Sequence, residues 1–178
     1  MIEKYKHIKH RNIFLYISIA LCFQPASVLA AGRDRVTLPD ASPPTVECIM
    51  EAATASRLPL AVLFGVLATE RGKPGEALRN ENGTWDMGPF QINTCHVNEL
   101  IGMGVDPATL LRDGCLGAYA AAWLLRKEYN RTGNLWEAVG AYHSRTPERR
   151  DAYIARVKNN LSRLQREGVA SLLAKGER

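Results

Sequence analysis

The chain has 178 residues, with 23 lysines and arginines against 18 aspartates and glutamates and a formal net charge of +5. This length suits one domain with its own core and leaves no room for two domains of ordinary size. Four of the basic residues and one acidic residue lie before residue 13, so the chain beyond residue 30 keeps 19 basic and 17 acidic residues. Nucleic-acid binding calls for a strongly basic face, so we expect no nucleic-acid partner.

Residues 1–30 have the pattern of a secretory signal peptide. Three lysines and an arginine come first, an apolar run from Ile13 to Phe23 follows, and Val28-Leu29-Ala30 supplies a small-residue exit. The apolar run has eleven residues, whereas a helix that spans a bilayer needs roughly 20. We therefore expect cleavage after Ala30 and no stable membrane insertion of the exported chain.

Three cysteines remain beyond the signal, at Cys48, Cys95 and Cys115. In an oxidising compartment one pair can form a disulfide and one thiol is left over. We favour Cys48 with Cys115, because each is expected to open a helix and their bond would tie the two helices together. Closing a loop of this length stabilises a fold by roughly 4 kcal/mol. The spacing does not fix the connectivity, so the other pairings stay open.

The remaining chain predicts a mainly α, single-domain protein of five to six helices with a long glycine-rich loop. Residues 31–44 contain three prolines and no periodicity, which predicts a flexible lead-in. The loop from Gly72 to Gly88 carries glycines and asparagines, with at most a short hairpin. The folded domain is expected over residues 45–165 and a tail over 166–178. Apolar periodicity predicts helices at 46–56, 59–71, 93–101, 115–129 and 135–142, and a last helix that begins after Pro147.

One face of the second predicted helix carries three apolar residues and a carboxyl at helical spacing: Leu63, Val66, Leu67 and Glu70. Desolvation on such a stripe and the negative end of the helix dipole both raise the pKa of Glu70. A glutamate kept partly protonated near neutral pH is what a general acid for glycoside cleavage requires. On helix geometry alone the alternative is an exposed last turn, with Glu70 paired to Arg71 or Lys73.

Three segments follow one another in the order and approximate spacing of a known family, spread over residues 45–145. They are Ala68-Thr69-Glu70-Arg71-Gly72, the block Asn80–Asn93 that ends in Gly-Pro-Phe-Gln-Ile-Asn, and Ala141-Tyr142-His143. Together they resemble the lysozyme-like lytic transglycosylases of the SLT superfamily, most closely the small group attached to conjugation and type IV secretion systems that includes the TrbN proteins. The resemblance implies a peptidoglycan substrate, a periplasmic location and local wall opening for such an apparatus.

The resemblance also implies roles for individual residues. Glu70 takes the place of the catalytic glutamate, and Gln91 that of the glutamine in the family's Gly-Leu-Met-Gln motif, which lines the sugar groove. Tyr142 matches a tyrosine near the catalytic carboxyl, so we expect its hydroxyl to donate a hydrogen bond that holds Glu70. The chain departs from the family at Arg71, where many relatives have serine, and at His143, where they have asparagine.

Side chains around the loop are expected to contact sugar. Asn82, Gln91 and Asn93 would supply hydrogen bonds, and Trp85 would stack on a sugar face, although core packing is an equal alternative for Trp85. The histidines beyond the signal show no paired ligand spacing, so no metal site is expected.

The mechanism that the resemblance implies needs one carboxyl. Glu70 protonates the glycosidic oxygen, and the substrate's own acetamido group stabilises the oxocarbenium-like centre. Glu70 then removes the proton of the muramyl C6 hydroxyl, which closes onto C1 to give a 1,6-anhydromuramyl product without a metal or organic cofactor. Asp86 and Glu81 are interpreted as solvated turn residues. Two alternatives stay open: a hydrolytic muramidase that uses one of them as a second carboxyl, and a noncatalytic peptidoglycan-binding scaffold.

Overall fold

The computed structural model describes residues 34–176, and the expected signal peptide lies outside these residues. Helices dominate the described part, so the predicted mainly α class is confirmed, with seven α-helices there instead of five to six. The helices are α1 (Val46–Ala55), α2 (Leu60–Glu70), α3 (Val97–Gly102), α4 (Pro107–Arg112), α5 (Gly114–Thr132), α6 (Leu135–His143) and α7 (Pro147–Gly176). The strands are β1 (Arg35–Thr37), β2 (Glu76–Arg79), β3 (Trp85–Met87) and β4 (Ile92–Asn93), followed by the 3-10 turn η2 (Thr94–His96).

Polar caps set several helix boundaries. The Asp113 carboxylate opens α5 by accepting from the backbone N–H groups of Cys115 and Leu116 at 2.8 and 3.0 Å. Gly133, at φ 68°, ends the same helix in the left-handed conformation. Asp106 likewise opens α4, a helix that we did not predict because its six residues are too few to display a period.

The four strands form one antiparallel sheet in the order β1-β2-β3-β4. A flexible lead-in was expected for residues 31–44. In the described part of this segment the chain instead forms β1, in which Arg35 pairs with Leu78 of β2. Backbone bonds continue this attachment from Leu38 N–H to Gly75 O at 2.7 Å and from Ser42 N–H to Arg112 O at 2.8 Å. A segment without side-chain periodicity is thus held by its backbone.

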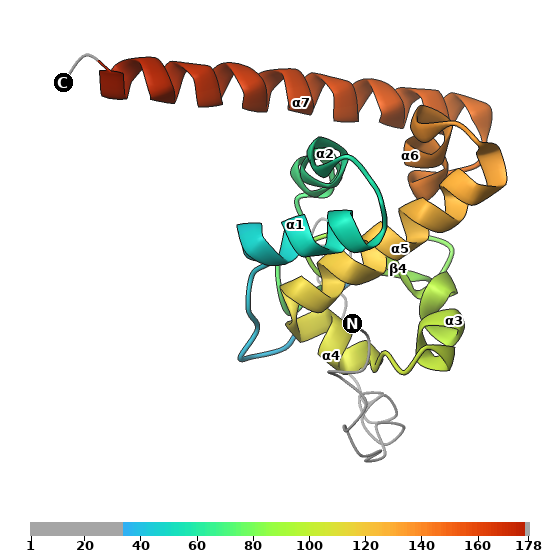
Figure 1. The fold of residues 1–178 in the computed structure, drawn as a ribbon. Helices are drawn as coiled ribbons and strands as arrows, with labels where there is room; N and C mark the ends of the chain where they lie inside the picture. Colours follow the sequence, from blue (N-terminus) through green and yellow to red (C-terminus); the bar gives the residue numbers. More distant parts are fainter. Residues whose placement is uncertain (1–33, 177–178) are drawn as a thin grey trace, which may run out of the picture.

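The long helix α7 lies against α2 and α6 and extends beyond the other helices (Figure 1). It runs to Gly176 without a break, so the tail expected from residue 166 is helical over its described part. Two glycines let α7 approach closely. A Cβ on Gly65 of α2 would stand 2.9 Å from Leu161 Cγ, and one on Gly140 of α6 would stand 2.3 Å from Arg150 Cγ. This packing brings the N-terminal half of α7 to the C-terminal ends of α2 and α6.

The predicted disulfide between Cys48 and Cys115 is confirmed and joins the first turns of α1 and α5. The Cα atoms of the two residues are 5.6 Å apart, within the range that disulfides require. Cys95 is the free thiol among the described residues, and it is exposed.

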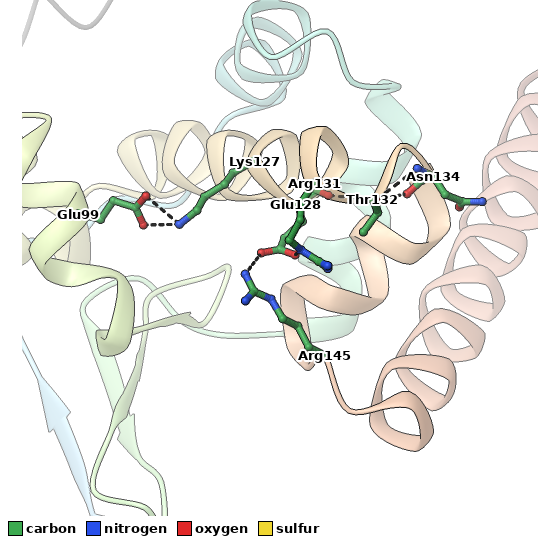
Figure 2. Close-up of polar contacts among 7 residues, drawn as sticks. All are labelled: Glu99, Lys127, Glu128, Arg131, Thr132, Asn134 and Arg145. Carbon is green, nitrogen blue, oxygen red and sulfur yellow. Dashed lines mark hydrogen bonds and ion pairs between the residues drawn. The ribbon is translucent and has the colours of Figure 1, made fainter.

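A buried carboxylate near the end of α5 anchors the segment that follows α6. Glu128 is 6% exposed and accepts from Arg131 Nε at 2.8 Å and from Arg145 Nη2 at 2.6 Å (Figure 2). The same close-up shows Lys127 of α5 paired with Glu99 of α3. The first group ties the connection between α6 and α7 to α5, and the second ties α3 to α5.

Within residues 34–176 no helix combines the length and apolarity needed to cross a membrane.

Candidate active site

The carboxyl of Glu70 stands at the C-terminal end of α2. Leu63 and Val66 on the same helix are fully buried, whereas Glu70 is only partly buried. The helix ends because Arg71 takes a left-handed conformation, at φ 55°, and its N–H bonds Leu67 O at 3.1 Å. For a residue with a Cβ this conformation costs on the order of 1 kcal/mol. It turns the chain at once from Glu70 into the loop, leaving the carboxyl at the rim of the core.

Tyr153 of α7 is the hydrogen-bond partner of this carboxyl. Its hydroxyl donates to Glu70 Oε1 at 2.6 Å, and its side chain is fully buried. Tyr153 lies on the apolar face of α7 with Val157 and Leu161, and its hydroxyl is the polar group of that face. That hydroxyl was the available signal, but the sequence does not say which residue it meets.

Burial raises the pKa of Glu70 from 4.5 to about 7. The hydrogen bond from Tyr153 opposes this shift, the negative charge of Asp86 adds to it, and the positive charge of Arg156 opposes it. A carboxyl with such a pKa exchanges its proton near neutral pH, which suits a group that must first donate a proton and then accept one.

The loop after Glu70 folds back onto itself at two glycines. Gly72 N–H bonds Pro89 O at 3.2 Å, and a Cβ on Gly72 would stand 2.0 Å from Gly88 O, so only glycine fits there. Gln91 has φ 49°, and its side-chain Nε2 donates to Gly88 O at 3.0 Å. The predicted substrate-binding Gln91 therefore lies in the segment that packs against Gly72, two residues beyond Glu70.

The expected hydrogen bond from Tyr142 to Glu70 is wrong. The Tyr142 hydroxyl donates to Phe90 O at 2.8 Å, which ties the end of α6 to the loop beside Gln91. The reason is that Phe90 is fully buried and its carbonyl needs a partner there, while α7 supplies the hydroxyl for Glu70. Tyr142 still belongs to the same site. Burial is the larger cause of the raised pKa of Tyr142, and the negative charge of Glu70 adds to it.

The two asparagines and Trp85 lie on the sheet side of the site. Asn82 is exposed in the turn between β2 and β3, and its side-chain oxygen accepts from Thr84 N–H at 3.1 Å. Asn93 donates from Nδ2 to Asp86 Oδ1 at 2.8 Å. Trp85 is partly buried and packs against the core. Contact of these three residues with sugar stays a prediction. The interpretation of Asp86 as a solvated turn residue is wrong, because Asp86 lies partly buried in β3, and its negative charge contributes to the raised pKa of Glu70.

No group of three or more histidine, cysteine, aspartate or glutamate side chains within residues 34–176 is arranged to hold a metal ion.

Residues 47–162 match the family model described as the transglycosylase SLT domain. Invasion protein IagB of Salmonella typhimurium strain SL1344 is 32% identical over 124 residues, 67% of this chain and 78% of the relative. Protein IpgF of Shigella flexneri is 33% identical over 132 residues, 74% of this chain and 76% of the relative. X polypeptide of Escherichia coli is 37% identical over 76 residues, 39% of this chain and 45% of the relative. The family match confirms the lysozyme-like fold, and the chain belongs to the transglycosylase SLT family.

Proposed function

We propose that this protein is a lytic transglycosylase that cleaves the β-1,4 bond between N-acetylmuramic acid and N-acetylglucosamine in peptidoglycan. The observation that carries the proposal is the partly buried Glu70 carboxyl, whose pKa is raised to about 7 and which takes the place of the catalytic glutamate in the resemblance described above. A single such group suffices for both proton transfers, because the substrate supplies the acetamido group and the C6 hydroxyl.

Glu70 donates a proton in the first step and accepts a proton in the second. The protonated carboxyl gives its proton to the glycosidic oxygen as that bond breaks, and the acetamido oxygen stabilises the positive charge at C1. The resulting carboxylate, held by the Tyr153 hydroxyl, then takes the proton of the C6 hydroxyl as its oxygen bonds C1. The enzyme returns to its starting state, and the product is a 1,6-anhydromuramyl end.

A hydrolytic muramidase is the second candidate, because Asp86 lies near enough to Glu70 for its charge to raise the pKa of that carboxyl. In that mechanism Asp86 would act as the second carboxyl and water would supply the new oxygen at C1. The hydrogen bond from Asn93 Nδ2 to Asp86 Oδ1 favours a fixed electrostatic role for Asp86 instead.

The test is to incubate the chain from residue 31, and its Glu70→Gln form, with purified peptidoglycan and to identify the released fragments by mass spectrometry. We expect anhydromuramyl ends from the first and none from the second. Reducing ends would establish the muramidase instead. If neither folded protein released fragments and both still sedimented with peptidoglycan, the noncatalytic scaffold would be established.

The cellular part of the proposal is wall opening in the periplasm for a conjugation or type IV secretion apparatus. It is supported by the signal-peptide pattern of residues 1–30 and by the resemblance to the TrbN group. The name of the Salmonella relative, invasion protein IagB, associates that protein with invasion, which is compatible with a specialised role at the cell envelope. Replacing the gene by its Glu70→Gln form in a conjugative host should lower transfer frequency, and unchanged transfer would refute this part.

A further inference from the structure

The ring of His143 lies on the ring of Tyr153. The two ring centroids are 4.7 Å apart and the planes differ by 7°, which is a parallel stack at a typical aromatic separation. His143 is the last residue of α6 and is exposed, whereas Tyr153 is fully buried on α7. The exposed imidazole of His143 thus contacts the residue whose hydroxyl holds Glu70.

This stack bears on the geometry of the catalytic carboxyl. The Tyr153 hydroxyl stands at the far end of its ring, so a small tilt of the ring moves the oxygen away from Glu70 Oε1, which lies at 2.6 Å. A flat group on the ring face opposes such a tilt. Arg156 also lies over this ring, with its guanidinium carbon 5.2 Å from the centroid.

The end of α6 is itself firmly placed. Gly140 allows α7 to pack directly on α6, and the Tyr142 hydroxyl bonds Phe90 O at 2.8 Å. Arg145, two residues after His143, is held by the buried Glu128 (Figure 2). His143 therefore offers a fixed plane against which the Tyr153 ring is aligned.

We propose that His143 is a positioning residue: its imidazole holds the Tyr153 ring in the orientation from which the hydroxyl reaches the Glu70 carboxyl. The inference rests on the proposed function only for the catalytic role of Glu70. It gives a physical role to the histidine that follows Tyr142, where the family's Ala-Tyr-Asn motif has asparagine.

The experiment measures how deleting the Tyr153 hydroxyl changes the pKa of Glu70, in three backgrounds. Carbon-13 NMR of the glutamate carboxyls in the chain from residue 31 follows the titration of Glu70, assigned through Glu70→Gln. Because the hydrogen bond stabilises the carboxylate, Tyr153→Phe should raise the pKa of Glu70 in the wild-type background. The same rise is expected in the His143→Phe background, which keeps a flat ring, and a much smaller one with His143→Ala.

An equal rise in all three backgrounds would overturn the proposal. His143 is exposed, so neither replacement should compromise folding, and thermal unfolding of each variant checks this. The comparison uses differences within each background, so a general change in hydration of Glu70 cancels.

Kinetics on soluble glycan strands gives a second readout. His143→Ala should lower kcat by about tenfold with KM unchanged, since a misaligned acid loses rate and not binding, and His143→Phe should restore most of kcat. A raised KM with unchanged kcat in both variants would make His143 a sugar contact and overturn the proposal. If the wild-type chain cleaves no glycan, the proposed function fails, and the NMR comparison still decides the role of His143.

Discussion

Replacing Glu70 by glutamine is expected to stabilise the fold at alkaline pH and to change its stability little at acid pH. Folding raises the pKa of this carboxyl from 4.5 to about 7. Between these values the folded chain binds more protons than the unfolded chain, so the free energy of unfolding falls as the pH rises through this window. Above pH 7 the loss is complete and, at 1.36 kcal/mol per pKa unit, amounts to about 3 kcal/mol. Glu70→Gln carries no charge and avoids it.

Urea denaturation of the wild-type and Glu70→Gln chains between pH 4 and pH 9 measures this difference. Glu81→Gln is a matched control, because Glu81 is an exposed carboxyl on the neighbouring loop, and its stability difference from wild type should stay constant with pH. A constant difference for Glu70→Gln as well would refute the reasoning, since the burial cost of the charged carboxyl would then be absent.

Three further changes test the scaffold of the site. Gly72→Ala should abolish glycan cleavage, because its Cβ would stand 2.0 Å from Gly88 O, whereas Gly102→Ala has open space and should keep full activity; an active, folded Gly72→Ala would contradict the packing. Glu128→Gln should lower the free energy of unfolding by about 2 kcal/mol, because it removes a buried carboxylate that accepts hydrogen bonds from two exposed arginines, and Glu99→Gln, from an exposed pair, by under about 1 kcal/mol; equal losses in urea titrations would refute this contrast. Reduction of the disulfide between α1 and α5, which closes a loop of 67 residues, should cost about 4 kcal/mol, and an unchanged urea midpoint with reductant would count against it.

The helices that carry Glu70 and Tyr142 were predictable because apolar residues repeat at helical spacing over two or more turns. The position of Glu70 at the end of an apolar stripe already indicated a raised pKa. The short hairpin that the loop allowed corresponds to β2 and β3. Strands β1 and β4 were not predicted because they have three and two residues, too few for an alternation to show, and their pairing depends on backbone bonds.

The partner of Glu70 could not be read from the sequence. Tyr153 follows it by 83 residues, and the two meet only because α7 packs on α2 at Gly65. The family pattern indicated Tyr142 instead, but the Tyr142 hydroxyl donates to Phe90 O in the loop. Periodicity gives the face of a helix, whereas the contacts of that face depend on how helices pair in three dimensions.

If Glu70 promotes closure of the muramyl C6 hydroxyl onto C1 as proposed, no oxygen from water enters the product. The most direct measurement is digestion of purified peptidoglycan in ¹⁸O-labelled water, followed by mass spectrometry of the released muropeptides. We expect the wild-type chain to form anhydromuramyl products, each lighter by one water than its reducing counterpart and free of the label, and the Glu70→Gln chain to form none. Reducing ends that carry ¹⁸O at C1 would contradict it and identify a hydrolase.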